Sequence, residues 1–182
     1  SVNDSRAYVK GCFHQFSFFP WNDDYFGLFS KARKIFELKN LIAGFPKNKF
    51  LSDNHQNDPD FTPRISFQFY PSGHGHLKPH SDPAGEHQLV LPSIVMSLKN
   101  KDYKNGGVYI ILNGEKFFYE DYCDVGDLVI LDPTIAHGVE LIDPGKKEDW
   151  LSFKGRWIVF FPINKYNNSD KISDAKEIAF DK

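Results

Sequence analysis

From Pro63 onward the chain consists of short runs rich in Ile, Val, Phe and Tyr, separated by Gly, Asn, Asp and Pro. Runs of about four to eight such residues between turn-forming residues predict strands, because successive side chains of a strand point to opposite faces. A strand cannot bury its apolar face alone, so these runs must pair into sheets. The predicted strands are 64–70, 88–98, 108–112, 116–122, 128–131, 138–142 and 156–161.

About seven or eight short strands without regular helical alternation favour a double-sheet jelly roll (a double-stranded β-helix) or a related cupin-like barrel. Ahead of them, apolar residues recur at three- and four-residue spacing between Asp23 and Phe45, which predicts an amphipathic helix packed on the outside. We therefore expect a mainly β protein with a flanking N-terminal helix. It would form a single domain, with helical and loop support in residues 1–62, the jelly-roll core in 63–165 and a polar tail in 166–182.

The composition gives no sign of a nucleic-acid or membrane partner. A formal charge of -2, with lysines scattered along the chain, provides no basic patch. No run approaches the roughly 18 consecutive apolar residues that a membrane-spanning helix needs. Cys12 and Cys123 form no metal-type pair, which favours two reduced thiols in a cytoplasmic protein.

Three histidines and an aspartate lie close together in the stretch FYPSGHGHLKPHSDP, residues 69–83. His80 and Asp82 are two residues apart, so on an extended segment their side chains point to the same side and could converge on one ion. Such a triplet is common by chance. His137 strengthens it, because it follows a short apolar strand that a jelly roll can fold back over the first segment. Arg156 opens a further apolar strand, RWIVFF.

The residue types explain the pattern. Two neutral histidines and one carboxylate on one face of a metal ion leave the opposite positions open, which is typical of non-haem Fe(II) oxygenases. An arginine beyond the metal can pair bidentately with the far carboxylate of a dicarboxylic acid such as 2-oxoglutarate, because its planar fork matches a carboxylate and its charge does not titrate. Arg156 is the candidate for that role.

Residues 64–161 resemble the Fe(II)- and 2-oxoglutarate-dependent oxygenases, in particular their prolyl-hydroxylase-like branch. FYPSGHGHLKPHSDP is similar to that branch's tyrosine, glycine loop and H-x-D triplet, SLKNKDYKNGG to its loop with paired glycines, and GDLVIL…HGV to its distal-histidine strand. The resemblance implies a double-stranded β-helix that uses Fe(II), O2 and the co-substrate 2-oxoglutarate. It implies that the metal ligands and catalytic centre are His80, Asp82 and His137, with Arg156 as the anchor for the C5 carboxylate and Tyr70 as a second contact to the co-substrate.

The same resemblance implies the reaction, which is hydroxylation of an unactivated C–H bond with release of succinate and CO2. Asp82 favours hydroxylation, because related halogenases carry a small residue in place of this carboxylate. Desaturation and ring closure can arise at the same ligand set.

Two departures from the family pattern concern the co-substrate site. The interval between His137 and Arg156 is longer than is usual in the family, with DPGKKEDWLSFKG as an insertion. Either a longer hairpin lies there, or Lys154 or another basic residue of the insertion is the anchor. On the central strand, where the prolyl-hydroxylase branch often offers a tyrosine, this chain has IVMSL, so either Met96 or Ser97 takes that place or no residue does.

His74 and His76 could join His80 in a three-histidine site, but that arrangement leaves Asp82 and His137 unexplained. We expect them instead on the loop before the ligand strand, at the rim where substrate enters. Further rim candidates, chosen by proximity alone, are Lys78, His87, Trp150 and Lys154.

The sequence leaves several functions open. A small-molecule or amino-acid-type substrate is favoured, because no basic or extended peptide-binding surface is evident. The alternatives are a protein (prolyl-type) side-chain hydroxylase, a cupin-type metalloenzyme that does not use 2-oxoglutarate, and a non-catalytic jelly-roll binding module. Fold alone does not decide between them.

Overall fold

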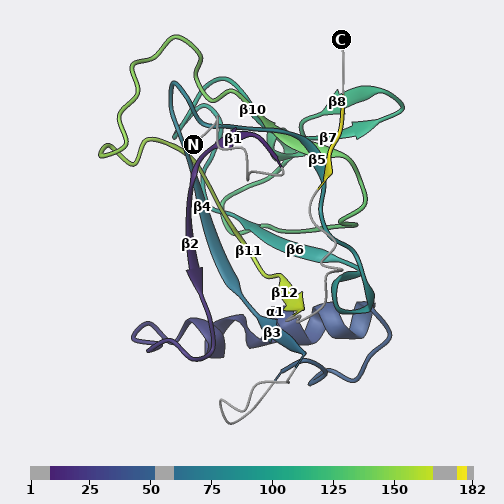
Figure 1. Cartoon of the computed structure of the whole chain (residues 1–182). Coiled ribbons are helices and arrows are strands. Elements are labelled where there is room, and N and C mark those ends of the chain that lie inside the picture. The colour runs from purple at the N-terminus through teal and green to yellow at the C-terminus, as the bar shows by residue number, and fades with distance from the viewer. Residues whose placement is uncertain (1–8, 52–59, 166–175, 180–182) are drawn as a thin grey trace.

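The structure is a computed structural model that describes residues 9–51, 60–165 and 176–179. Two antiparallel sheets face each other, and a helix runs across one end (Figure 1). One sheet has the strand order β1-β5-β10-β7-β8, with β13 paired to β5, and the other has the order β2-β4-β11-β6-β9. The strands are β1 Gly11–Cys12, β2 His14–Phe18, β3 Phe61–Pro63, β4 Ile65–Pro71, β5 His76–Ser81, β6 Leu91–Val95, β7 Gly107–Leu112, β8 Glu115–Phe117, β9 Leu128–Leu131, β10 His137–Glu140, β11 Gly155–Phe160, β12 Ile163–Lys165 and β13 Lys176–Glu177.

The strand order is that of a jelly roll. Along the chain, β4 and β6 lie in one sheet and β5 and β7 in the other, and β9, β10 and β11 again alternate between the sheets. Every paired strand of the two sheets is antiparallel to its neighbour. The predicted mainly β jelly roll is therefore confirmed.

The helix α1 (Leu28–Ile42) is shorter than the predicted span of 23–45, and its ends explain why. The N-cap residue is Gly27, whose left-handed φ of 62° ends the helix on that side, and the carboxylate of Asp24, outside the helix, accepts hydrogen bonds from the first two helical amides, of Leu28 and Phe29. At the other end Gly44 adopts a left-handed φ of 76°, and the amide of Phe45 reaches back to the carbonyl of Asn40. This arrangement ends the helix before Phe45.

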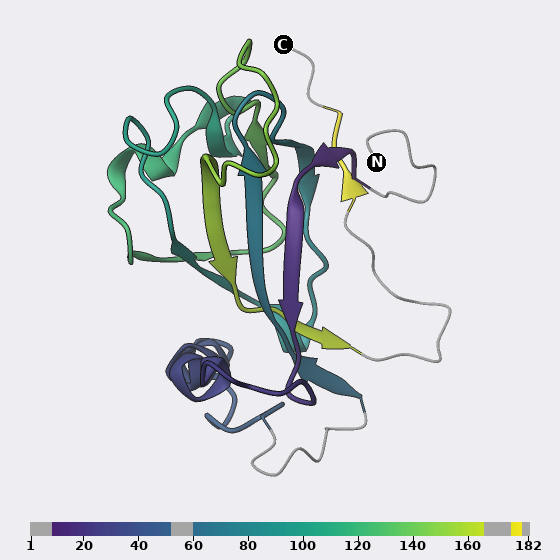
Figure 2. The same cartoon turned by 90° about the vertical axis from the view of Figure 1, so that its left-hand side faces the viewer.

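α1 packs on the outer face of the β4–β11 sheet, near the start of β4 and the end of β11 (Figure 2). Its Ala32 and Phe36 form one buried cluster with Ile65 and Val159 of the sheet. Further from the helix, the same outer face carries an aromatic layer in which Phe69 stacks on Trp157 at 4.5 Å between ring centroids. Much of the apolar burial thus lies outside the space between the two sheets.

β4 shows the reason for this distribution. Its residues alternate, so that Ile65, Phe67 and Phe69 face outward while Gln68 and Tyr70 face the other sheet. The row of larger polar side chains is therefore the inner one, which is the reverse of an ordinary half-buried strand.

Some elements differ from the predictions. β5 was not among the predicted strands, and β1, β2 and β13 add strands at or beyond the ends of the expected core. The predicted strand 116–122 stops at Phe117 and is followed by a 3₁₀ turn, η2 (Tyr119–Tyr122); another such turn, η1 (Glu86–Gln88), occupies the start of the predicted strand 88–98. Within the described residues no helix is long and apolar enough to cross a membrane.

One lysine of α1 is buried where the helix meets the sheet. Lys39 is only 2% exposed, and its Nζ donates to the side-chain oxygen of Gln88 at 3.3 Å and to the carbonyl of Phe161 at 3.2 Å. Burial lowers the pKa of Lys39 to about 7. Protonated Lys39 is thus hydrogen-bonded to two neutral acceptors and has no carboxylate to compensate its charge among them. Removing this charge from water therefore lowers the stability of the folded chain.

This burial predicts a pH-dependent stability. Between pH 7 and the unfolded-state pKa of 10.5, the unfolded chain binds more protons at Lys39 than the folded chain, so stability rises with pH. We expect Lys39→Met to be more stable than the wild type at pH 7. The difference in unfolding free energy between Lys39→Met and the wild type should shrink by about 2 kcal/mol between pH 7 and pH 9, because only the wild type becomes more stable as Lys39 loses its proton. Urea unfolding at both pH values measures it, and an unchanged difference would contradict the lowered pKa.

Candidate metal centre

A β-bulge in β5 aims the first histidine of the candidate site. His137 of β10 pairs with His80, but the next pair is Val139 with Leu77, so two residues of β5 lie opposite the single residue Gly138. Without the extra residue, Leu77 and His80 would face opposite sides of the sheet. With it, both side chains line the space between the sheets.

Gly138 permits the strands to approach at the bulge. A Cβ added there would lie 2.9 Å from the carbonyl oxygen of Leu77 and 2.7 Å from the hydroxyl of Tyr109. Both contacts are too short for a side chain, so the bulge and the glycine depend on each other.

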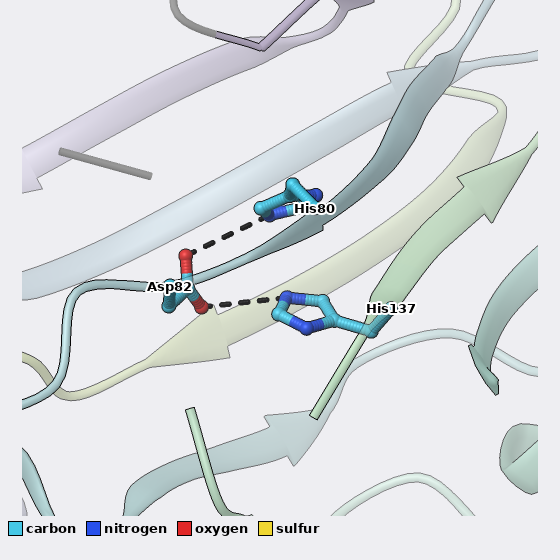
Figure 3. A group of neighbouring side chains, drawn as sticks. All are labelled: His80, Asp82 and His137. Carbon is cyan, nitrogen blue, oxygen red and sulfur yellow. Dashed lines mark ion pairs between the residues drawn. The ribbon is translucent and has the colours of Figure 1, made fainter. Parts of the chain in front are cut away.

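His80, Asp82 and His137 converge at the end of β5 and the start of β10 (Figure 3). Their candidate ligand atoms all lie within 4.8 Å of one another. His80 Nε2 is 3.6 Å from Asp82 Oδ1, and His137 Nε2 is 3.3 Å from Asp82 Oδ2. The structure therefore brings together the three residues that the sequence predicted as metal ligands.

Backbone carbonyls fix the orientation of both imidazoles. Nδ1 of His80 lies 2.9 Å from the carbonyl of Lys78, and Nδ1 of His137 lies 2.8 Å from that of Ile135. Because a carbonyl can only accept, each Nδ1 carries a hydrogen, and the Nε2 atoms are left to face Asp82. This is the tautomer in which Nε2 can bind a metal ion.

The charges at the centre depend on one another. Burial alone would raise the pKa of Asp82, but the hydrogen bonds and charges of His137 and His80 hold that pKa well below its usual range. Burial alone would lower the pKa of His137, and the hydrogen bond and charge of Asp82 outweigh it and raise that pKa. A divalent cation among the Nε2 and carboxylate oxygen atoms would take the place of the shared protons.

A cavity of about 100 Å³ extends from this centre between the sheets. Its lining is mostly apolar, with a few polar groups, including Gln68, Ser93 and Tyr119. Arg156 also lines it, from β11. A mostly apolar cavity with a few convergent polar groups is the usual form of a small-molecule site.

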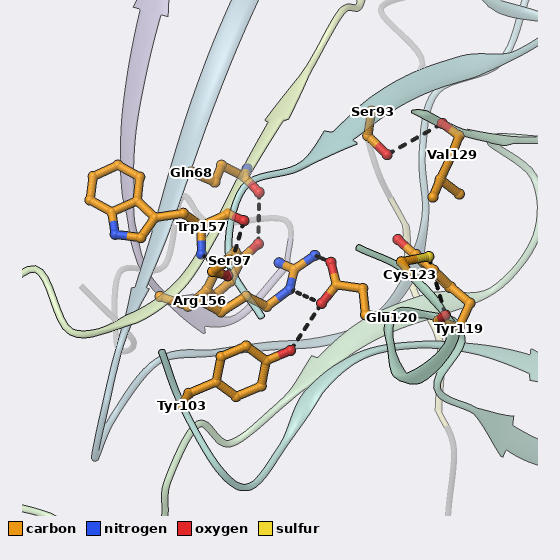
Figure 4. A network of polar contacts seen from close by, with 11 residues as sticks. Gln68, Ser93, Ser97, Tyr103, Tyr119, Glu120, Cys123, Val129, Arg156 and Trp157 are labelled. Atoms are coloured by element: carbon orange, nitrogen blue, oxygen red, sulfur yellow. Dashed lines mark hydrogen bonds and ion pairs between the residues drawn. The ribbon is translucent and has the colours of Figure 1, made fainter. Parts of the chain in front are cut away.

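Arg156 is already paired with a carboxylate of this chain. Its Nε donates to Glu120 Oε2 at 2.8 Å and its Nη2 to Glu120 Oε1 at 2.7 Å, and both side chains are at most 4% exposed (Figure 4). Tyr103 donates a third hydrogen bond to Glu120 Oε2, at 3.1 Å. Burial would lower the pKa of Arg156, but the Glu120 carboxylate raises it. Glu120 therefore occupies the bidentate edge expected to receive the co-substrate.

The other edge of the Arg156 guanidinium, which carries Nη1, has no carboxylate partner among the described residues. Nη1 of Arg156 makes no hydrogen bond to any residue in the described part of the chain. The guanidinium also lies over the ring of Tyr70, 5.2 Å from its centroid. Tyr70 lines the cavity and donates to Gln68 at 2.7 Å, so its hydroxyl is engaged with a neighbouring side chain.

The long interval before Arg156 leaves its position in the sheet intact. β11 pairs with β4 in regular register, with Arg156 opposite Tyr70. At Gly155 the φ is 144°, and an added Cβ would overlap the carbonyl oxygen of Tyr70. The inserted residues form a connection outside the sandwich, and Lys154 lines a separate surface pocket. Arg156 and not Lys154 faces the cavity.

Several rim candidates lie away from the cavity. His74, His76 and Lys78 line a separate pocket with Glu140. The other candidates are also elsewhere: His87 lies beside Phe61, Trp150 packs on His14, and Met96 and Ser97 line the same outer pocket as Lys154.

Sequence reasoning missed Glu120 and Gln68. Glu120 lies in the aromatic run FFYEDY directly beside a second carboxylate, Asp121, so the sequence alone does not distinguish the buried carboxylate from the exposed one. Gln68 belongs to a row of polar residues at every second position, a pattern that predicts a strand but does not indicate that this row faces a cavity.

No protein-family model and no curated protein matches the chain. Among solved structures, it is similar to JOX2, in a crystal structure in complex with 2OG, Fe and JA, with 14% identity, a TM-score of 0.46 and coverage of 88% of this chain and 51% of JOX2. It is also similar to KdgF from Halomonas sp., with 15% identity, a TM-score of 0.28 and coverage of 57% of this chain and 69% of KdgF. The chain thus spans about half the length of JOX2. At these scores neither likeness indicates what the chain does.

We expect His80→Ala and His137→Ala to lose stoichiometric Fe(II) binding, because each removes one of three protein ligands. Anaerobic Fe(II) titration with equilibrium dialysis measures the binding. Circular dichroism should show that the sheets persist.

His76→Ala is the matched control, because His76 lies on the same strand but in the other pocket. It should bind Fe(II) like the wild type. Loss of iron in His76→Ala equal to that in His80→Ala would revive the three-histidine site.

Proposed function

We propose that the chain is an Fe(II)- and 2-oxoglutarate-dependent dioxygenase of the prolyl-hydroxylase-like branch, acting on an unactivated C–H bond of a small-molecule or amino-acid-type substrate. The observation that carries the proposal is the convergence of His80, Asp82 and His137 at one end of a cavity that Arg156 lines. Tyr70, ten residues before His80 and under the guanidinium, supports the finer placement.

The donor set fits Fe(II). Two Nε2 atoms in the ligating tautomer and one carboxylate form the 2-His-1-carboxylate set that suits non-haem iron. With 2-oxoglutarate and O2, bound Fe(II) supplies an oxidation that hydroxylates a C–H bond and releases succinate and CO2.

The cavity fits 2-oxoglutarate through one free edge of Arg156. Glu120 fixes the guanidinium from one side and leaves Nη1 able to donate to a carboxylate within the cavity. Because Glu120 also neutralises much of the arginine's charge, this anchor would be weaker than an unpaired arginine.

The chain's other residues position and protect the reaction. Leu77, Val139 and Ile158 line the cavity with apolar groups that exclude water. The carbonyls of Lys78 and Ile135 hold the imidazoles in one orientation, so the metal ligands need little rearrangement when the ion binds.

The Arg156–Glu120 pair also favours a second candidate. An arginine with a permanent internal carboxylate needs no co-substrate to satisfy it, so the same centre could serve a cupin-type metalloenzyme that does not use 2-oxoglutarate. The two candidates differ in whether the Fe(II) protein binds 2-oxoglutarate at all.

We expect Arg156→Gln to weaken 2-oxoglutarate binding by at least about tenfold, since a charge-assisted hydrogen bond contributes about 1.5–3 kcal/mol. Anaerobic titration of the Fe(II) protein, followed by the metal-to-ligand charge-transfer band of the chelate, measures both iron and co-substrate binding. Iron binding should persist, because Arg156 is not a ligand.

The control is the double variant Arg156→Gln/Glu120→Gln. The single variant leaves Glu120 buried and unpaired, which costs about 3–5 kcal/mol of stability, and the double variant removes both charges. The double variant should regain stability without regaining 2-oxoglutarate affinity. A wild-type protein without the charge-transfer band would establish the second candidate instead.

Glu120→Gln alone should have the opposite effect on the co-substrate. It leaves Arg156 with an uncompensated charge beside the cavity, so 2-oxoglutarate should bind about tenfold more tightly. Added 2-oxoglutarate should therefore raise the unfolding temperature of the Glu120→Gln protein by more than it raises that of the wild type. The same titration and a thermal melt check this, and unchanged affinity would show that Arg156 does not contact the co-substrate.

A further inference from the structure

Arg64 is a partly buried cation whose side chain makes no hydrogen bond to any residue that the structure describes. Its Nε is the one fully buried side-chain nitrogen or oxygen in the described residues that lacks a hydrogen bond. The backbone N–H is satisfied by the carbonyl of Pro162 at 2.9 Å, so only the side chain is left over. Buried polar groups without partners are rare in folded proteins, and a guanidinium is among the most costly of them.

Arg64 precedes β4 and continues its inner row. Counting back by two from Gln68 gives Ser66 and then Arg64 on the same face. Its guanidinium lies over the ring of Phe160, 5.9 Å from the centroid, and Phe160 lines the cavity.

This position is at the metal end of the sandwich. β4 and β5 lie in different sheets and share the turn 72–75, so the start of β4 and the end of β5 are at the same end. Electrostatics agree: burial lowers the pKa of Arg64, and the charge of Asp82 opposes that shift. A metal ion bound to Asp82 would take up this carboxylate, so Arg64 would lose its partial compensation.

The two arginines of the inner face therefore differ. Arg156 is saturated on one edge by Glu120 and lines the cavity. Arg64 lies by the metal end and has no carboxylate hydrogen-bonded to it within the described residues. Under the proposed function, the metal ion would hold one carboxylate of 2-oxoglutarate and Arg156 the other, so neither would require Arg64. A second anion at this end would satisfy it.

We propose that Arg64 binds a carboxylate of the substrate at the mouth of the metal site. This inference rests on the proposed function and narrows its substrate class to small organic acids, free amino acids among them. Arginine suits the role because its fork binds a carboxylate through two parallel hydrogen bonds.

The test uses the full chain loaded with Fe(II) and 2-oxoglutarate. Free amino acids and aliphatic and aromatic monocarboxylic acids are each compared with their primary amides. Two readouts are taken: the unfolding temperature without O2, and succinate release by mass spectrometry once air is admitted. Acids should raise both, and their amides should not.

Arg64→Gln should raise the half-saturating concentration of an active acid by at least about tenfold while leaving the charge-transfer titration of 2-oxoglutarate unchanged. Arg33→Gln is the matched control, since Arg33 lies on α1 and pairs with Glu37. It should behave like the wild type.

Three results would overturn the proposal: acids and amides that act equally or not at all at millimolar concentration, an Arg64→Gln protein that responds to acids like the wild type, or loss of 2-oxoglutarate binding in Arg64→Gln. The last would make Arg64 a co-substrate residue. A wild-type protein with no charge-transfer band would instead refute the proposed function, so the two failures are distinct.

Discussion

The buried ion pair between Arg156 and Glu120 sets what the interior of this jelly roll can accept. It joins β11 to the 3₁₀ turn η2, and Tyr103 adds a third side chain to the same carboxylate. Such a pair contributes little net stability, but loss of either member leaves a buried charge, so the two are retained together. The interior therefore holds a guanidinium that is oriented, largely neutralised and still able to donate from one edge.

The metal centre depends on a different constraint, the extra residue of β5. The bulge turns His80 toward the cavity, and Gly138 on the neighbouring strand allows the close contact. His76 and Lys78 line another pocket. Without the extra residue, His80 would point to the same side of the strand as these two, away from the cavity. The backbone geometry of β5 therefore decides which of His74, His76 and His80 can be a metal ligand.

The sequence was sufficient for the architecture and for His80 and Asp82, because strand patterning and the H-x-D spacing are local signals. His137 is distant in sequence and was identified by its place after a short apolar strand and by the family resemblance. It was insufficient for β5, where Pro79 and the bulge interrupt the alternation that identifies strands. The partner of Arg156 could not be read either, since Glu120 is 36 residues away and only the tertiary fold brings the two together. Arg64 was missed because an alternating polar row ordinarily marks the solvent face of a strand.

The inverted polarity of β4 separates two tasks that most small domains combine. α1 and the aromatic layer around Phe69 and Trp157 cover the outside of the sheet, while the inner row is left to polar side chains. Apolar packing thus stabilises the sandwich on the outer face of this sheet as well as between the two sheets. A fold arranged in this way can exchange residues of its inner row, and with them the molecules it recognises, while the scaffold behind them stays the same. The inner row is where relatives of this chain should diverge in specificity.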